Sequence, residues 1–308
     1  MNTPYLSVFI GLTAWDLGAL LLIVGLYSCR ALSAGMPALQ AGLRAAILGS
    51  LAMFAITGVL LLVGRSVEMS GMPLRQIPSV LLEVLRQTRF GHWWLARSAA
   101  LFSLIGLESL RRMPRPRIAI WVLLALLVLA RSATNHGGDQ GVSWLLAIDT
   151  LHLYAAGLWT GTLFAATVAL FPRMQNSEPV ERALVFERLS RLSGYAVMVL
   201  LTTGVWIAHK EVGSWMALWS TSYGRVLDLK LALIALMLAL GAHNRYVRRP
   251  ALWAASGPFC DIQDSKAFQG AQRALRMEAG LGLGVLILVA ILVHGMPPAA
   301  MQALAGSA

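Results

Sequence analysis

The sequence has few charged residues and almost no cysteine. Charged residues make up 13% of the 308 positions, whereas soluble domains carry about 25%. The two cysteines, Cys29 and Cys260, lie far apart, and neither a Cys-x-x-Cys nor a His-x-x-x-His pair occurs. The low charge excludes an ordinary soluble domain. The cysteine spacing argues against a disulfide framework, and a metal site would need donors from distant parts of the chain.

The sequence also lacks the motifs of several function classes. It has no phosphate-binding loop and no nucleophile paired with a base, so we predict that it is not an enzyme. Its formal net charge of +11 does not form a basic stripe interleaved with aromatic residues, which argues against nucleic-acid binding. Met1–Ser7 carries no basic residue ahead of the first apolar stretch, so no cleavable signal peptide is expected.

Apolar residues, in contrast, are abundant and make up 57% of the chain. A helix needs about 20 apolar residues to cross the hydrocarbon core of a bilayer. Eight stretches approach or exceed this length, at residues 8–29, 44–64, 93–110, 118–135, 145–171, 192–209, 226–244 and 279–296. We therefore predict an all-α polytopic integral membrane bundle of about eight transmembrane helices, with one membrane domain over residues 1–308. No convincing internal repeat is visible in the sequence.

Arginine placement predicts the orientation of these helices, because short cytoplasmic loops carry an excess of Lys and Arg. Strongly basic links follow the third, fifth and seventh predicted spans, at residues 111–117, 173–191 and 245–276. These links are predicted to face the cytoplasm, which makes both termini periplasmic. The link after the second span is also basic, although this orientation places it outside. Its residues 77–88 have an amphipathic pattern, which predicts a helix on the outer membrane surface.

The fifth predicted span combines a spanning length with ionisable residues near its start. Asp149, His152 and Trp159 recur at helical spacing, so they are predicted to share one face. Gly157 and Gly161 form a pair of small residues four apart, which would let another helix approach closely. Because ionisable residues inside a membrane span are costly, the acid and the histidine indicate a functional site.

Histidine and methionine gather toward the predicted periplasmic side. Soft thioether ligands favour Cu⁺, imidazole binds Cu⁺ or Cu²⁺, and zinc would more often recruit thiolates or a tight set of histidines and carboxylates. We therefore predict a copper ion as the bound metal. The predicted ligands, with His152 central, are His152, His136, His209, His294, Met69 and Met72. The residues predicted to orient the histidines or to compensate charge are Asp149, Asp16, Asp228 and Trp159.

Simpler roles remain open for several of these residues. Asp16 and Asp228 could instead pair with Arg97, Arg225 or Lys230 in a structural ion network. Histidines at the ends of membrane spans are common interfacial residues. The two methionines could serve packing alone.

Three stretches resemble a known family. The run Asp149–Gly161, which reads DTLHLYAAGLWTG, resembles the DxLHLxxAxxWxG signature of the copper resistance protein D (CopD) family. Residues Thr88–Arg97 and Ser132–His136 are similar to the same family. The resemblance implies an eight-helix protein of a bacterial inner membrane that moves copper from the periplasm to the cytoplasm. It also implies a small periplasmic copper-binding partner of the copper resistance protein C type.

These observations predict a multi-pass inner-membrane protein that binds copper and imports it within copper homeostasis or resistance, with lipid around it. Two alternatives remain open. A b-type cytochrome for electron transfer would hold haem between His152 and either His209 or His294. A docking subunit would pass copper to a periplasmic partner without transporting it.

Overall fold

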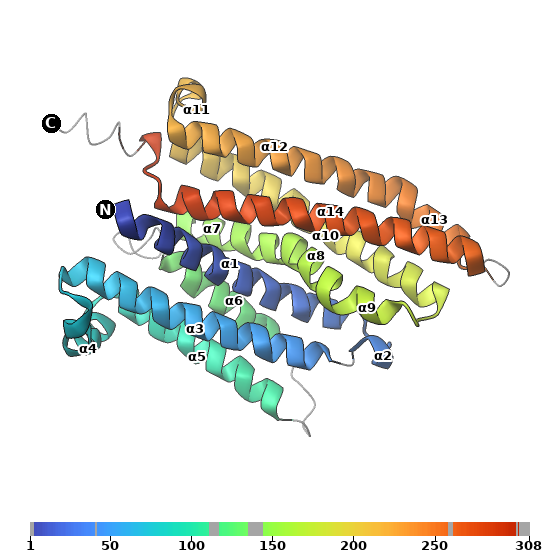
Figure 1. Ribbon diagram of the computed structural model, residues 1–308, viewed down its shortest axis with the longest axis horizontal. Coiled ribbons are helices and arrows are strands. Elements are labelled where there is room, and N and C mark those ends of the chain that lie inside the picture. The colour runs from blue at the N-terminus through green and yellow to red at the C-terminus, as the bar shows by residue number, and fades with distance from the viewer. Residues whose placement is uncertain are drawn as a thin grey trace. The chain divides into compact units, whose positions relative to one another are not determined.

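The structure, a computed structural model, describes residues 3–40, 42–110, 117–134, 144–257, 261–299 and 301. The regular elements in this part of the chain are all helices, and it contains no strand (Figure 1). They include one short 3₁₀ turn and three π-helical turns among the α-helices. The predicted all-α class is therefore confirmed for the residues described.

The chain divides into two compact units. The first unit comprises Met1–Leu20 and Leu48–Tyr154, and the second comprises Leu21–Ile47 and Ala155–Ala308. Three helices, α1, α3 and α7, run across these boundaries. One membrane domain over the whole chain stays a prediction.

The first unit contains the first part of α1, most of α3 and α7, and all of the elements between α3 and α7. The bounds of these elements are α1 (Thr3–Leu32), α3 (Leu43–Ser70), η1 (Leu74–Gln76), α4 (Ile77–Gln87), α5 (Arg89–Ser109), α6 (Arg117–Ala133) and α7 (Trp144–Ala156). The other elements belong to the second unit: α2 (Pro37–Gln40), η2 (Gly157–Gly161), α8 (Thr162–Ala165), η3 (Ala166–Leu170), α9 (Phe171–Met174), α10 (Pro179–Val212), α11 (Trp215–Ser220), α12 (Ser222–His243), η4 (Asn244–Arg248), α13 (Arg249–Ala254) and α14 (Asp261–His294).

Six helical segments of the described chain are long and apolar enough to cross a membrane: Leu6–Leu32, Pro37–Ser70, Trp144–Met174, Pro179–Val212, Ser222–Ala254 and Lys266–His294. They agree with six of the eight predicted spans. The third and fourth predicted spans coincide with α5 and α6, which are not among the six. The α6 helix has only 17 residues, and α5 includes the polar residues His92, Arg97 and Glu108. The count of eight spans and the orientation of the termini stay predictions.

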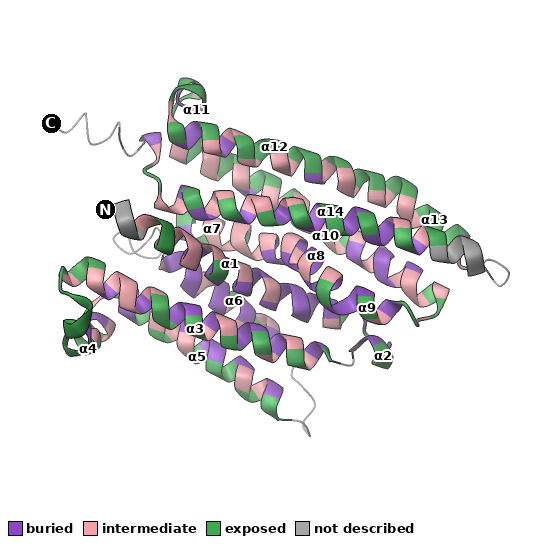
Figure 2. Ribbon diagram, in the orientation of Figure 1, coloured by how far each residue is buried: buried purple, intermediate pink, exposed green. Residues whose placement is uncertain are grey.

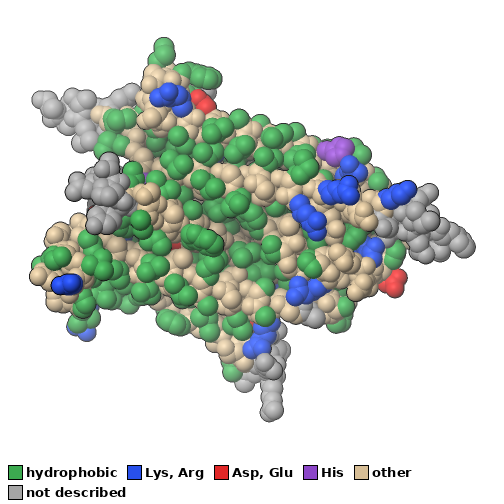
Figure 3. Space-filling view, in the orientation of Figure 1, with side chains coloured by type: hydrophobic (Ala, Val, Ile, Leu, Met, Phe, Trp, Pro, Cys, Tyr) green, Lys and Arg blue, Asp and Glu red, His purple; other side chains and the backbone are tan. Residues whose placement is uncertain are grey.

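Helices α10, α12 and α14 of the second unit expose apolar side chains that water would solvate poorly. The exposed fractions reach 72% for Val205 on α10 and 53% for Leu229 on α12, and exposed residues run along α12 in Figure 2. Figure 3 shows hydrophobic side chains over most of the visible face, while Lys and Arg gather where α13 lies. Exposed apolar helix faces bounded by basic ends are typical of helices in lipid.

The predicted amphipathic helix is confirmed as α4. Its residues Ile77 and Val84 are buried, while Glu83 and Arg86 on other faces are exposed. A Cβ atom at Gly91 of α5 would overlap the carbonyl oxygen of Val84, so α4 folds closely against the start of α5. The position of α4 on the outer membrane surface stays a prediction.

The predicted close approach at Gly157 and Gly161 is confirmed, and the partner is the second half of α1. A Cβ atom at Gly161 would overlap the carbonyl oxygen of Leu21, and one at Gly25 would overlap the carbonyl oxygen of Gly161. A Cβ atom at Gly157 would lie 2.9 Å from Cβ of Val24. The two backbones therefore touch directly, as small residues permit between membrane helices.

Two helix starts share one local construction. Thr88 before α5 and Thr221 before α12 are extended, with φ and ψ of −104° and 148° and of −106° and 152°. Each hydroxyl accepts a hydrogen bond from the amide of the glycine three residues later, Gly91 at 2.9 Å and Gly224 at 3.0 Å. Each hydroxyl also donates to the carbonyl four residues earlier at 2.6 Å. Such side-chain caps satisfy amides that a helix start leaves unpaired.

Candidate functional site

The first unit fixes Asp149 near the start of α7. Ser132, at the end of α6, donates a hydrogen bond from its hydroxyl to the Asp149 carboxylate. His152 lies three residues after Asp149 on the same helix, and both are partly buried. Ser132 and Asp149 come from two of the stretches that resemble the CopD family. The contact therefore joins those stretches and holds a carboxylate within one helical turn of an imidazole.

A buried ion network lies in the same unit. Asp16 of α1 is 0% exposed and accepts hydrogen bonds from Arg97 of α5 and Arg131 of α6, which are 4% and 2% exposed. The second Arg97 contact, from Nη1 to Oδ2, is 3.3 Å, and the Thr57 hydroxyl donates to Oδ1 at 3.0 Å. The pairing of Asp16 with Arg97, one of the two interpretations of Asp16, is confirmed. Its effect on a bound metal stays a prediction.

Helix α6 connects this network to the start of α7. Arg131 contacts Asp16, and its neighbour Ser132 contacts Asp149. Two consecutive residues of α6 therefore hold two carboxylates, one from α1 and one from α7. Sequence reasoning missed Arg131, although an arginine inside a predicted membrane span was a visible signal of a buried partner.

The two methionines lie at the far end of α3 and just beyond it. Met69 is 52% exposed and Met72 is 38% exposed. Gly71 between them has a φ of 66°, which turns the chain after α3 at a residue without a side chain. Exposed thioethers can meet an ion from solution, but their predicted role as ligands is untested.

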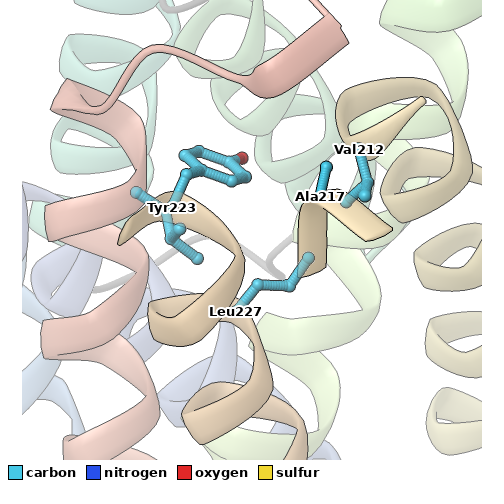
Figure 4. Packing of buried hydrophobic residues seen from close by; sticks show 5 residues of the cluster. Val212, Ala217, Tyr223 and Leu227 are labelled. Atoms are coloured by element: carbon cyan, nitrogen blue, oxygen red, sulfur yellow. The ribbon is translucent and has the colours of Figure 1, made fainter. Parts of the chain in front are cut away.

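The other predicted site residues lie near one apolar cluster in the second unit, formed by Val212, Ala217, Tyr223, Leu227 and Leu292. Figure 4 shows the cluster, with labels on Val212 at the end of α10, Ala217 on α11, and Tyr223 and Leu227 at the start of α12. The predicted site residues His209, Asp228 and His294 each lie within three residues of a cluster member. The cluster thus brings the ends of α10 and α14 and the start of α12 into one region. His209 is exposed, and the other two are partly buried.

Trp159 has a partner that the sequence did not reveal. Its indole Nε1 donates a hydrogen bond of 3.1 Å to Oε1 of Glu278 on α14, and Asn244 Nδ2 donates one of 3.1 Å to Oε2. Trp159 and Glu278 are 5% and 3% exposed. Sequence reasoning overlooked Glu278 because it directly precedes the eighth predicted span. An acid at the edge of an apolar stretch was the available signal.

The structure does not assemble the predicted ligands into a ready metal site. In the ranges that it describes, no group of three or more His, Cys, Asp or Glu side chains could hold a metal ion. His136 lies outside the described residues. His152 belongs to the first unit, and His209 and His294 belong to the second, so their convergence stays a prediction. Cys29 is a buried free thiol, and Cys260 lies outside the described residues.

Family models match both parts of the chain. A model described as copper resistance protein D-like, N-terminal domain, matches residues 1–144. A model described as copper resistance protein D matches residues 183–292. The first model covers Asp16, Arg97, Arg131 and Ser132, and the second covers His209, Asp228 and Glu278.

Two curated proteins are similar to the chain. Copper resistance protein D of Pseudomonas syringae pv. tomato is 30% identical over 217 residues, which cover 67% of each protein. Copper transport protein CutJ of Bacillus subtilis (strain 168) is 27% identical over 227 residues, which are 70% of this chain and 38% of CutJ. The match therefore spans well under half of CutJ. No solved structure gives a significant match.

Proposed function

Because this chain belongs to the copper resistance protein D family, we propose that it binds copper in the periplasmic half of a bacterial inner membrane and carries it to the cytoplasm. One relative is named a copper transport protein, which supports transport over electron transfer. Copper is the cargo in this proposal. We propose no catalysed reaction.

The observation that carries the proposal is the fixed carboxylate next to His152. The hydrogen bond from Ser132 holds Asp149 in place, three residues ahead of His152 on one helix. A carboxylate near a metal-binding imidazole orients the ring and adds negative charge that favours a cation. We propose His152 as the central ligand. The further proposed ligands are His136, His209 and His294, with Asp16, Asp228 and Trp159 as supporting residues.

The exposed thioethers extend the proposal to the point of copper entry. Met69 and Met72 would receive the ion and pass it inward, because thioethers bind Cu⁺ and exchange it readily. A small periplasmic copper-binding protein of the copper resistance protein C type would deliver the ion there. This role requires both methionines to lie on the periplasmic side. We propose eight transmembrane spans and two periplasmic termini, an arrangement that meets this requirement.

Copper binding by a His152→Ala variant tests the central ligand. The full chain in detergent is titrated with Cu⁺ and with Cu²⁺, and bound metal is measured. We expect the variant to lose high-affinity copper. Asp149→Asn keeps the imidazole but loses the charge beside it, so affinity should fall about 10–100-fold.

The matched control is His92→Ala in the same unit. His92 is exposed, and its Nε2 lies 2.9 Å from the carbonyl oxygen of Arg86, so we expect unchanged copper binding. Equal copper binding by His152→Ala and the wild type would contradict the proposed ligand. Copper uptake into sealed proteoliposomes then separates transport from docking, since a docking subunit binds the ion without moving it.

A further inference from the structure

A half-open cavity of about 510 Å³ is lined by residues of the second unit alone. Its walls come from η2, α8, α10, α12, η4, α13 and α14. Most of the lining is apolar, and the buried polar groups in it are Trp159, Ser193, Asn244 and Glu278. The proposed copper function uses Trp159 only as a supporting residue and gives the other three no role.

Glu278 is a buried carboxylate without a cationic partner. It is 3% exposed, and the hydrogen bonds to its two oxygens come from neutral donors, Trp159 and Asn244. No ion pair to Glu278 occurs among the residues that the structure describes. This contrasts with Asp16, where two arginines compensate the buried charge. A buried carboxylate that lacks such compensation can lower its cost by taking up a proton.

The cavity also provides acceptors that a protonated carboxyl needs. The Oδ1 atom of Asn244 and the Oγ atom of Ser193 are buried and have no hydrogen-bond partner within the described part of the chain. An amide presents a donor on one side and an acceptor on the other. In the structure, Asn244 donates to the carboxylate of Glu278. After a half-rotation of its amide, Oδ1 would accept the hydrogen bond of the carboxylic acid. Asn244 can therefore serve both protonation states.

Both hydrogen-bond donors to Glu278 lie in π-helical turns, Trp159 in η2 and Asn244 in η4. A π turn inserts an extra residue into a helix and is frequently found at functional sites. Two such turns on different helices direct their side chains to one carboxylate. This coincidence distinguishes Glu278 from an acid that is buried only by packing.

The titratable groups around the cavity come from three neighbouring elements. Arg191 and Tyr195 lie on α10, Arg245 and Tyr246 on η4, and Arg249 on α13. The residues of α12, η2 and α8 that line it are not titratable, and Glu278 is the only titratable lining residue of α14. The hydrogen bonds from Trp159 and Asn244 favour the ionised carboxylate, whereas burial favours the protonated one. Both states are therefore within reach.

The donor set favours a proton over copper. One carboxylate, one amide oxygen and one hydroxyl are hard oxygen donors, whereas Cu⁺ prefers thioether, thiolate or imidazole. The cavity lining contains no histidine or cysteine and only one methionine, Met198, which is 67% exposed. A proton needs one carboxylate and one acceptor, and both are present.

We infer that Glu278 is a proton-binding site of the second unit, with Asn244 as its two-way hydrogen-bond partner. An O–H bond forms on the carboxylate as one breaks in a hydronium ion, the reverse step returns the proton to water, and nothing is oxidised or reduced. The coupling of this step to copper movement is an extension that rests on the proposed transport function.

Infrared spectroscopy of the full chain during a pH titration tests the proton site without copper. The C=O stretching band of a protonated carboxyl should appear with falling pH in the wild type and be lost in Glu278→Gln. Asn244→Leu keeps the carboxyl but removes one hydrogen-bonding group, so the band should remain at a shifted frequency. This second variant keeps the test decisive if Glu278→Gln does not fold.

The matched control is Glu211→Gln, since Glu211 accepts a 2.6 Å hydrogen bond from Tyr223 at the other end of the unit. It should leave the Glu278 band unchanged. A band that persists in Glu278→Gln, or that keeps its frequency in Asn244→Leu, would overturn the assignment.

Uptake of copper into proteoliposomes at several pH values tests the coupling. Wild-type uptake should depend on pH, and Glu278→Gln should lose that dependence while it binds as much copper as the wild type. Equal pH dependence in the two proteins would disprove the coupling. An absence of uptake in the wild type would instead disprove the proposed transport, whereas the infrared result would still decide the proton site.

Discussion

Among single residues, Asp16 is the anion that makes two buried arginines tolerable in the first unit. Asp16→Asn keeps the volume but leaves Arg97 and Arg131 without their shared counter-charge. Loss of one partner from a buried ion pair costs about 3–5 kcal/mol. We expect the variant to unfold at lower temperature and lower denaturant concentration, as measured by circular dichroism in detergent.

A surface pair provides the control for this variant. Glu187 and Arg191 lie 3.9 Å apart with side chains 31% and 56% exposed. Glu187→Gln should change the unfolding free energy by less than about 1 kcal/mol, because exposed pairs contribute little. A similar loss in both variants would mean that burial does not strengthen the Asp16 network.

Residue pairing was the least predictable feature. The sequence allowed Asp16 to pair with Arg97, because both fall in apolar stretches where a lone charge is costly. It gave no means to choose Arg131 as the second partner, since that contact joins residues 115 positions apart. The same applies to Glu278 and Trp159, which are 119 positions apart. Such pairs depend on how helices pack, which periodicity does not reveal.

Among the elements, the contact of α1 with η2 depends on glycine at both surfaces. Gly161→Ala would push a methyl group into the carbonyl of Leu21, and overpacking of this kind costs about 1–3 kcal/mol. We expect reduced thermal stability and a lower yield of folded protein in detergent. Gly49→Ala is the control because a Cβ atom there meets nothing within 4 Å, and its effect should stay within about 1 kcal/mol. Equal stability of the two variants would contradict the close contact.

Helix positions were predicted better than helix ends. The predicted span 192–209 lies within α10, which begins at Pro179, and the span 279–296 begins well inside α14, which starts at Asp261. Hydropathy marks the part of a helix that lipid can cover, whereas the backbone hydrogen bonds continue into polar sequence. The π turns have no counterpart in the sequence pattern and were not predicted.

For the whole molecule, the proposed orientation puts the basic helix ends and the exposed methionines on opposite sides of the membrane. A reagent added outside should therefore reach the methionine positions and not the basic ends. In a background without Cys29 and Cys260, Met69→Cys should react with a membrane-impermeant maleimide added to intact spheroplasts. Tyr246→Cys, at a position 73% exposed among the arginines of η4, should react only after permeabilisation. Labelling of both from the same side would contradict the proposed orientation.

The class of the molecule was predictable because composition alone excludes a soluble domain, and the family followed mainly from one short run of residues in α7 and η2. The shared construction at Thr88 and Thr221 was not predictable. Both places share a leucine three residues before the threonine and an aromatic residue followed by glycine after it, and a pattern of four positions is too short to stand out. The likeness emerges when backbone angles and hydrogen bonds are compared.

The extra residue in η2 has a mechanical consequence. A π turn carries one residue more than the regular winding of an α-helix, so a shift of this turn along the helix would redirect the side chains that it passes. Each step past a given position would swivel the side chain there by about 100°, which is one residue of an α-helix. A step past Trp159 would withdraw the indole from Glu278. A local change of winding in one helix would then remove a hydrogen-bond donor from Glu278 on another helix.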